Sequence, residues 1–282
     1  MDIKIDELEL LAQGGQSKIY SLDRNSILRV PQREIDCDRI KYEYEVYKLM
    51  QEKIAVPRVN GFLEVDGKPC LIMEKITGQD LVAILKTNLL SLFTLPKKLA
   101  HIHKNIFSVK IEEKLVTNHE KAKYCITSSS ILNSEQKDRL LYILSTLETG
   151  TALCHGDFHP GNIIISNGKE YIIDWSAASY GAAYFDIAHT YLLMINTPRL
   201  DNVSDMEYKI QKIITRYIGK RYLKEICNIQ KINPIILWKY FLIKAAERTF
   251  YGLETEKIIL HKFITENIKK DQVDIRKIKR FA

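Results

Sequence analysis

Two aspartates and an asparagine, Asp157, Asn162 and Asp174, are the side chains whose types and spacing could do chemistry together. The asparagine follows the first aspartate by five positions, and the second aspartate follows the first by seventeen. Phosphoryl transfer uses such a set, because one carboxylate holds the attacking hydroxyl while an amide and a second carboxylate hold magnesium on the nucleotide. Each residue alone is more often a turn or cap residue. The combination predicts a catalytic aspartate, Asp157, and two magnesium ligands, Asn162 and Asp174.

The elements that must position these side chains are a loop and a hairpin. Two short β-rich runs flank Asn167-Gly168, which is the strongest short hairpin signal. The runs cover residues 163–165 and 171–173. Centring the turn on this dipeptide places Asn162 nearly opposite Asp174, so the two metal ligands are expected side by side at the open end of the hairpin. Asp157 lies in the loop just before it.

The same residues carry a resemblance to a known family. Cys154 to Asn162, with Ile172 to Trp175, resembles the signature of the aminoglycoside phosphotransferase and choline kinase superfamily, which are small-molecule kinases with a protein-kinase-like fold. That signature reads His-Gly-Asp-x-His-x-x-Asn, followed by Ile-Asp-Trp or a close variant. The resemblance implies that Asp157 is the catalytic base.

The resemblance also assigns supporting residues around the loop. It implies that Asp186, in the run Phe-Asp-Ile-Ala, is a buried acid that supports the catalytic loop. His155 is expected to pack and form hydrogen bonds there rather than act as a base. A zinc site at His155 and His159 is disfavoured, because Pro160 follows and no third ligand lies nearby in the sequence.

A phosphate-binding turn is expected near the N-terminus. Gly14-Gly15-Gln16-Ser17 separates two predicted strands, and its backbone N–H groups could cradle phosphates. It is not the full glycine-rich loop of protein kinases, and a two-glycine turn is often only a turn. The position predicts Gly15 and Ser17 as nucleotide-binding residues, with the serine hydroxyl as an extra donor.

The third predicted strand carries Arg29 where a kinase places the cation that holds the α and β phosphates. Arginine is always charged and binds phosphate in a bidentate manner, so it can replace the usual lysine. By the resemblance its helix partner is Glu43, with Glu45 as the alternative. A surface arginine would also fit this position of an alternating strand. Adenine is expected against backbone groups of the connector around Glu74 and Ile76.

The composition excludes several classes of protein. No apolar run reaches the roughly 18 residues of a membrane span, and the N-terminus lacks the apolar core of a secretion signal. Five widely spaced cysteines with no Cys-x-x-Cys pair favour a reducing cytoplasm. The net charge of +7 is mild and forms no aromatic-interleaved basic stripe. We therefore expect a cytoplasmic protein, monomer or homodimer, with neither a membrane nor a nucleic-acid partner.

The order of expected elements indicates an α+β, two-lobed, protein-kinase-like fold with a small β-rich lobe and a larger helical lobe. Residues 1–76 are expected to form the N-terminal nucleotide-binding lobe, and residues 77–282 the C-terminal catalytic and acceptor-binding lobe. Strands are expected over residues 8–13, 18–22, 26–30, 58–65 and 69–73, the last two joined by an Asp-Gly turn. Helices are expected over residues 36–53, 80–89, 93–105, 134–148, 185–195, 206–219, 234–251 and 257–269.

The acceptor is less well defined. A polycationic aminoglycoside needs acidic walls, but residues 175–180, directly after Asp174, contain no acid. Acids appear later, at Glu247, Glu254 and Glu256, where a solvated helix face would also explain them. Four aromatic residues could cage a quaternary amine or could belong to the core: Trp238, Tyr240, Phe250 and Tyr251.

These observations predict a phosphotransferase that uses ATP or GTP with Mg²⁺ and a small hydroxylated acceptor, either an antibiotic, as in antibiotic resistance, or an amino-alcohol or sugar metabolite. A protein kinase is an alternative, although no Ala-Pro-Glu follows Asp174 and residues 175–186 are short for an activation segment. A nucleotide-binding pseudokinase that acts as a sensor or interaction module is another, supported by Arg29. The intact Asp157, Asn162 and Asp174 argue against it, because a protein that only binds nucleotide has no need for the base.

Overall fold

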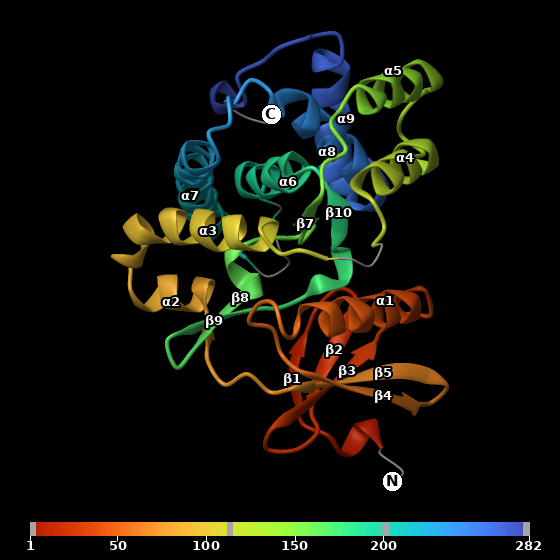
Figure 1. Ribbon diagram of the computed structural model, residues 1–282, viewed down its shortest axis with the longest axis vertical. Coiled ribbons are helices and arrows are strands. Elements are labelled where there is room, and N and C mark those ends of the chain that lie inside the picture. Colours follow the sequence, from red (N-terminus) through yellow and green to blue (C-terminus); the bar gives the residue numbers. More distant parts are fainter. Residues whose placement is uncertain (1–3, 112–114, 198, 200–202, 279–282) are drawn as a thin grey trace. The chain divides into compact units, whose positions relative to one another are not determined.

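The computed structural model describes residues 4–111, 115–197, 199 and 203–278 (Figure 1). The chain divides into two compact units. Unit 1 comprises residues 1–87 and 160–178, and unit 2 comprises residues 88–159 and 179–282. A strand-rich unit and a helical unit give the α+β architecture that the order of elements predicted. This division is geometric and does not show what each unit does. The nucleotide-binding lobe of residues 1–76 and the catalytic and acceptor-binding lobe of residues 77–282 therefore remain predictions.

Unit 1 contains a five-stranded antiparallel sheet in the order β1-β2-β3-β5-β4. The strands are β1 (Leu10–Gln13), β2 (Ser17–Ser21), β3 (Ser26–Pro31), β4 (Val59–Val65) and β5 (Lys68–Glu74). Helix α1 (Ile35–Met50) packs on β3, β4 and β5. The β4–β5 turn has positive φ at Asp66 (51°) and Gly67 (72°), as a two-residue hairpin turn requires. Four buried side chains form one apolar core of the sheet: Leu28, Val30, Val65 and Cys70.

The predicted hairpin is the second part of unit 1, and its existence and register are confirmed. Strand β8 (Ile163–Ser166) pairs with β9 (Lys169–Ile172) so that Ile163 faces Ile172, and the turn residues Asn167 and Gly168 have φ of 49° and 78°. A short strand, β6 (Gln79–Asp80), adds to the edge of β8 and leads into α2 (Leu81–Thr87). A side chain at Gly78 would collide with the carbonyl of Ile165, so this junction needs glycine.

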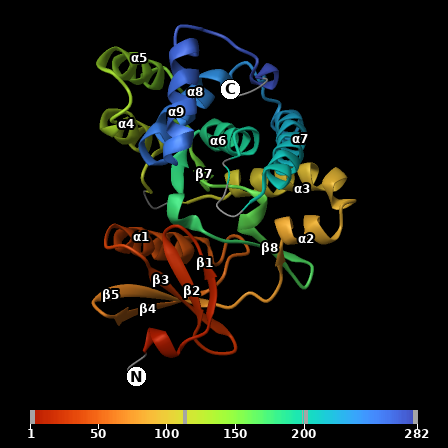
Figure 2. The ribbon, with the colours of Figure 1, turned by 180° about the vertical axis from the view of Figure 1, so that it is seen from behind.

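Unit 2 is built from helices around a two-stranded ribbon, as Figures 1 and 2 show. The helices are α3 (Ser91–Phe107), α4 (Asn118–Ser128), α5 (Ser134–Ser145), α6 (Ala183–Ile195), α7 (Asp205–Gln230), α8 (Leu237–Tyr251) and α9 (Glu254–Asn267). The ribbon pairs β7 (Ala152–Cys154) with β10 (Ser179–Gly181). Helix α6 packs on α7 and α8, and α8 also contacts α4, α5 and α9, so α6 and α8 form the centre of the unit.

Two helices differ from the sequence prediction by more than a few residues at their ends. Helix α7 was expected to stop at residue 219 but runs to Gln230. A Cβ at Gly219 would lie 2.7 Å from Cβ of Met194 on α6, so the glycine allows two helices to pack closely and does not end one. Helix α4 was not predicted, although Thr117 and Glu120 form a capping box at its start.

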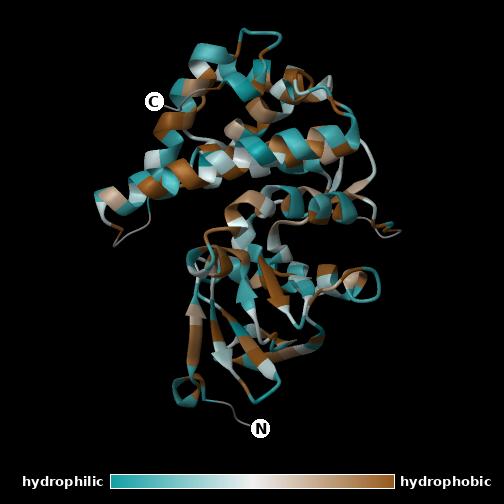
Figure 3. Ribbon diagram, turned by 90° about the vertical axis from the view of Figure 1, so that its left-hand side faces the viewer, coloured by the Kyte–Doolittle hydropathy of each residue, from teal (hydrophilic) through white to brown (hydrophobic). Residues whose placement is uncertain are grey.

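The helices show the banding expected of elements that bury one face. In Figure 3, hydrophobic and hydrophilic residues alternate along the helices.

Within the described residues, no helix combines the length and the apolar character needed to cross a membrane.

Candidate active site

A buried arginine between two carboxylates lies at the centre of unit 1. Nη2 of Arg29, on β3, donates a hydrogen bond to Oδ1 of Asp174 at 3.1 Å, and its Nε lies 3.2 Å from Oε2 of Glu43, on α1. The second contact is an ion pair without hydrogen-bond alignment, because both of its atoms are buried and lack a hydrogen-bond partner. Glu45, the alternative partner, is 62% exposed and pairs with Lys48. The structure therefore brings together Arg29, Glu43 and Asp174, and turns Arg29 inward.

The charges of this group are unequal, since one guanidinium faces two carboxylates. Burial raises the pKa of Glu43 to about 7, although Arg29 and the N–H of Trp175 oppose the shift. Burial disfavours the Arg29 cation, but Glu43 and Asp174 outweigh it and raise the pKa of the guanidinium. Both pKa values are therefore raised, which keeps Arg29 charged but favours the neutral form of Glu43. Burial is the cause of the rise in the pKa of Glu43, whose side chain is fully buried.

The backbone holds Asp174 in an unusual conformation. Its φ of 62° lies in the left-handed region, which non-glycine residues adopt rarely and often at functional sites. Its N–H donates to the hydroxyl of Tyr47 at 3.0 Å, and the next N–H, of Trp175, donates to Oε1 of Glu43 at 3.1 Å. The hydroxyl of Ser176 donates to its Oδ1 at 2.9 Å. These bonds fix a carboxylate that is 35% exposed.

Asn162 faces Ile173, the residue before Asp174, across the end of the hairpin. It ends a short 3₁₀ helix (Pro160–Asn162), and its carbonyl accepts a hydrogen bond from the N–H of Ile173 at 3.0 Å. Among the described residues no group of three His, Cys, Asp or Glu side chains could hold a metal ion. Mg²⁺ is commonly held by one or two protein oxygens together with water and substrate phosphates. An amide and a carboxylate from neighbouring positions fit that ion.

The predicted phosphate turn joins β1 to β2. The N–H of Gly14 donates to the carbonyl of Ser17 at 3.0 Å, and the side chain of Gln32 donates to the carbonyl of Gly14. A Cβ at Gly15 would meet nothing within 4 Å, so this residue borders open space. Ser17 is buried and begins β2. The turn thus offers the backbone of Gly15 to a ligand more readily than the hydroxyl of Ser17.

The predicted adenine connector follows β5. The carboxylate of Glu74 accepts the N–H of Arg58 at 3.1 Å, so its side chain serves the local fold. Within the described part of the chain, the backbone N–H and C=O of Ile76 have no hydrogen-bond partner. Such an unsatisfied edge suits recognition of a base by backbone groups.

The loop that carries Asp157 belongs to unit 2. Asp186, on α6, accepts the N–H of His155 at 2.6 Å and that of Gly156 at 2.9 Å, and the φ of 80° at Gly156 needs glycine. The N–H of Asp157 donates to Nδ1 of His155 at 3.3 Å. Its carboxylate is 39% exposed and lies 3.8 Å from Nε2 of His159. The structure thus joins Asp186, His155 and Asp157 in one fixed loop.

One residue of this loop's support was missed from the sequence. Nε2 of His103, on α3, lies 2.9 Å from Oδ2 of Asp186. Burial alone would raise the pKa of Asp186, but His103 and the backbone N–H groups lower it to about 2. The sequence did carry a signal for this role, because His103 lies on the apolar face of α3 with Leu99, Ile102 and Ile106. A histidine buried on such a face needs polar partners for its ring nitrogens.

The predicted acceptor acids are paired within unit 2. Glu247 accepts from Nζ of Lys244 at 2.6 Å, and both its side chain and that of Lys244 are buried. Glu256 accepts two hydrogen bonds from Arg248, each at 2.6 Å. Glu254 is 81% exposed and pairs with Lys257. Trp238 and Tyr240, two of the candidate cage residues, are buried in the core.

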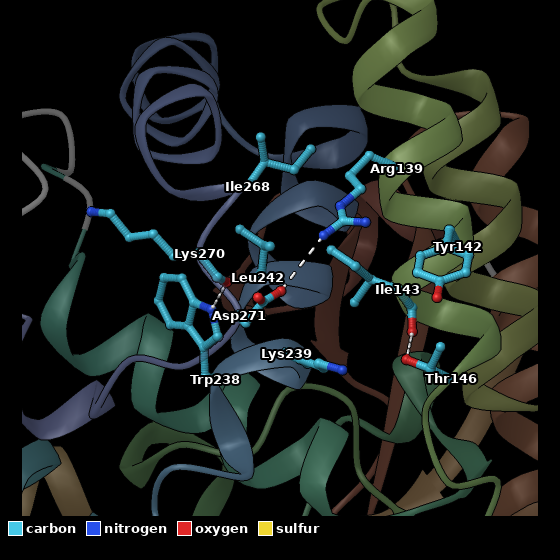
Figure 4. Close-up of a pocket in the computed structure, with 10 residues that line it drawn as sticks. All are labelled: Arg139, Tyr142, Ile143, Thr146, Trp238, Lys239, Leu242, Ile268, Lys270 and Asp271. Carbon is cyan, nitrogen blue, oxygen red and sulfur yellow. Dashed lines mark hydrogen bonds and ion pairs between the residues drawn. The ribbon is translucent and has the colours of Figure 1, made fainter.

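A cavity of about 240 Å³ lies among α5, α8 and the segment after α9 (Figure 4). It is lined by Arg139, Tyr142, Ile143, Thr146, Trp238, Lys239, Leu242, Ile268, Lys270 and Asp271. In this cavity Arg139 pairs with Asp271 at 3.7 Å, and the indole N–H of Trp238 donates to the carbonyl of Lys270 at 2.9 Å. None of the predicted catalytic, nucleotide or metal residues lines it, so the candidate chemistry lies elsewhere.

Comparison with known proteins bears on the family and the fold. Residues 128–208, which include Asp157, Asn162 and Asp174, match the model of the phosphotransferase enzyme family. No curated protein matches the sequence significantly. The structural matches below are all at 15–20% identity and therefore bear on the fold.

The fold is that of the aminoglycoside phosphotransferases. A thermostable mutant of aminoglycoside phosphotransferase APH(4)-Ia, in complex with AMP-PNP and hygromycin B, matches with a TM-score of 0.66 and 15% identity, covering 93% of this chain and 91% of that one. The streptomycin–ATP complex of APH(2")-IIa matches at 0.60 and 18%, covering 94% and 93%. ADP-bound APH(2'')-Ib matches at 0.56 and 20%, covering 95% and 93%. The resemblance to this kinase-like superfamily and the predicted fold class are confirmed.

Proposed function

We propose that this protein transfers a phosphoryl group from a nucleoside triphosphate, ATP or GTP, to a hydroxyl of a small molecule. The observation that carries the proposal is the buried group of Arg29, Glu43 and Asp174. A strand cation held by a helix carboxylate beside a metal-binding aspartate is the arrangement with which kinases hold nucleotide phosphates. The match of residues 128–208 to a phosphotransferase family supports it.

The nucleotide would be bound by residues of unit 1. The backbone of Gly15, with Ser17 beside it, would face the phosphates, Arg29 would pair with them, and Glu43 would keep Arg29 in place. The backbone edge from Glu74 to Ile76 would receive the base. When bound at Asn162 and Asp174, magnesium supplies positive charge that offsets the charge of the phosphates.

Asp157 would act on the acceptor. Its carboxylate is 39% exposed, while Asp186 and His155 fix the backbone beneath it. It would orient the acceptor hydroxyl and accept its proton late in the reaction. Most of the rate enhancement would come from positioning and electrostatics, since the chain needs to form no covalent intermediate.

The charges of unit 2 bear on the class of acceptor. The neighbouring structures include complexes with hygromycin B and streptomycin. In this chain, Glu247 and Glu256 are neutralised by Lys244 and Arg248 at 2.6 Å, so neither offers an unpaired charge to a polycation. We propose an acceptor with few or no positive charges, such as a sugar or an amino alcohol, rather than a polycationic aminoglycoside.

A nucleotide-binding sensor without catalysis is the second candidate. The observation that favours it is the hydrogen bond between Arg29 and Asp174, which uses an oxygen that a metal ion would otherwise bind. The partly exposed Asp157 on its fixed loop favours the enzyme, because binding alone requires no base.

We place the activity in the cytoplasm. None of the five cysteines, all of which lie in the described part of the chain, forms a disulfide, and four of them are buried. Buried cysteines without disulfides are typical of a reducing compartment.

The experiment that tests the function is ADP release by the purified protein with Mg-ATP or Mg-GTP across a panel of acceptors. The panel contains neutral sugars, choline, ethanolamine, macrolides and aminoglycosides. Release that depends on a weakly charged acceptor, and that Asp157→Ala abolishes, is the expected result. Nucleotide binding without release for any acceptor would favour the sensor, and release only with aminoglycosides would overturn the proposed acceptor class.

A further inference from the structure

A chain of buried polar groups connects α7 and α3 to the loop of Asp157. The hydroxyl of Tyr222, on α7, lies 2.6 Å from Nδ1 of His103, on α3. Nε2 of the same ring lies 2.9 Å from Oδ2 of Asp186, which in turn accepts the N–H groups of His155 and Gly156. Tyr222 and His103 are fully buried, and Asp186 is 2% exposed. Each group therefore depends on the others for its hydrogen bonds.

The proton positions follow from the chemistry of the end groups. Asp186 is ionised, since its pKa is lowered to about 2, and a carboxylate only accepts hydrogen bonds. Nε2 of His103 must therefore carry a proton and donate it. Burial raises the pKa of Tyr222 well above its ordinary value, so its hydroxyl keeps its proton at the 2.6 Å hydrogen bond with Nδ1 of His103. This hydrogen bond fixes the orientation of the histidine ring.

The imidazole of His103 also contacts the other side of the loop. It stacks on the ring of Phe158, with centroids 4.1 Å apart and planes 22° apart, and Phe107 packs at 4.3 Å from it. The carbonyl of Phe158 accepts the hydroxyl of Thr190 at 3.0 Å. His103 is thus linked to both sides of Asp157. It is linked to His155 and Gly156 through Asp186, and it contacts Phe158 directly.

We propose that His103 is a positioning residue for Asp157, and that Tyr222 orients His103 for this task. The inference rests on the proposed function, in which Asp157 is the base. His103 holds the backbone on both sides of the base, and so fixes where the carboxylate lies. A shift of about 1 Å in a catalytic group can cost about a hundredfold in rate. His103 does not itself touch the acceptor or the nucleotide.

Two amide substitutions separate positioning from packing. The side chain of His103→Gln can place an amide nitrogen near the position of Nε2 and so keep the donor to Asp186. The side chain of His103→Asn is one methylene shorter, so its amide falls near Nδ1 and cannot reach Asp186. The two variants have similar polarity and both lose the stacked ring. His101→Asn, an exposed histidine on the same helix, is the matched control.

The first readout is hydrogen exchange of the amides of His155 and Gly156. We expect these amides to exchange about tenfold faster or more in His103→Asn than in wild type, with exchange in α9 unchanged. His103→Gln and His101→Asn should stay near wild type. Unchanged exchange in His103→Asn, or equal acceleration throughout unit 2, would overturn the proposal.

The second readout is turnover with Mg-ATP. We expect His103→Asn to lower kcat by about tenfold to a hundredfold while KM for Mg-ATP changes less than about twofold, and His103→Gln to recover most of the loss. Tyr222→Phe, which removes one oxygen, should lower kcat in the same direction and serves if His103→Asn does not fold. An equal loss of kcat in His103→Gln and His103→Asn would show that His103 acts by packing and does not position Asp157.

The two proposals can fail separately. An active wild type whose His103→Asn variant keeps normal loop exchange and normal kcat refutes positioning and leaves the phosphotransferase intact. A wild type that releases no ADP, with faster loop exchange in His103→Asn, refutes the phosphotransferase and leaves the structural link from His103 to the loop.

Discussion

Nη2 of Arg29 lies 3.1 Å from Oδ1 of Asp174, although 145 positions separate the two residues in the chain. Arg29 comes from the third strand of the sheet, and Asp174 follows the hairpin of β8 and β9. Glu43, from α1, pairs with the same guanidinium at 3.2 Å. Three segments of unit 1 therefore meet at a single buried cation, and the predictions for the nucleotide site depend on it.

Arg29→Ala should weaken binding of Mg-ATP by well over tenfold, because it removes a charged contact to phosphate and leaves two carboxylates without their shared cation. Arg29→Lys should lose less, since lysine keeps the charge but cannot reach both carboxylates in the same way. Titration with a fluorescent ATP analogue measures both. Arg24→Ala, at an exposed position of the β2–β3 turn, is the control. Binding by Arg29→Ala within about twofold of wild type would remove Arg29 from the nucleotide site.

Glu43→Gln should raise the KM for Mg-ATP more than Glu45→Gln, because Glu43 is the buried partner of Arg29 and Glu45 is 62% exposed. The amide of Gln can still accept the N–H of Trp175 but no longer attracts the guanidinium. We expect about a tenfold or greater rise in KM for Mg-ATP in Glu43→Gln, and a value near wild type in Glu45→Gln. The reverse order would identify Glu45 as the functional carboxylate.

Asp186 should make the stability of the protein sensitive to acid. Its pKa in the folded chain, about 2, lies below the ordinary value of 3.8, so the fold favours the charged form. The stabilisation is fully present above about pH 4 and is lost as the pH falls towards about 2, with a total of about 2 kcal/mol. Asp186→Asn should flatten the free energy of unfolding across this window, as measured by urea unfolding at several pH values. If Asp186→Asn keeps the wild-type dependence of the free energy of unfolding on pH, other carboxyl groups cause that dependence.

Removal of magnesium should weaken nucleotide binding through Asp174. Mg-ADP should raise the Tm of wild type, since a ligand present at about 100 times its Kd stabilises by about 2.7 kcal/mol. Addition of EDTA should remove most of that increase. In Asp174→Asn the increase should be small with or without EDTA, because one of two oxygen ligands has lost its charge. A large increase in Asp174→Asn that EDTA abolishes would place the metal at other residues.

The fold was largely predictable where signals are local. The Asn167-Gly168 and Asp66-Gly67 turns have the positive φ values that their sequences predict, and the strands on either side pair in the expected register. The end of α7 was not predictable, because Gly219 is a helix breaker by local rules and a close-packing residue only once Met194 lies against it. Tertiary contact, absent from the local sequence, decides such positions.

In the candidate site, too, local sequence signals were sufficient for some residues and tertiary contacts were needed for others. Asp157, Asn162 and Asp174 could be proposed from their spacing, since their distances along the chain are short, and their roles remain predictions. The resemblance favoured Glu43 with Glu45 as the alternative, and the structure shows that Glu43 pairs with Arg29 while Glu45 is exposed, because residues two positions apart lie on nearly opposite sides of a helix. His103 could not be tied to Asp186 from sequence, because 83 positions separate them.

The measurement that tests the central claim most directly compares Asp157→Asn with wild type for phosphoryl transfer and for nucleotide binding. Asn keeps the size of the side chain but cannot accept the proton of the hydroxyl. The control is Asp271→Asn, which alters a carboxylate that is 88% exposed. The account predicts that Asp157→Asn binds Mg-ATP like wild type and transfers phosphate at least about a hundredfold more slowly. Transfer at the wild-type rate, or equal loss of binding and transfer, would contradict a catalytic role for Asp157.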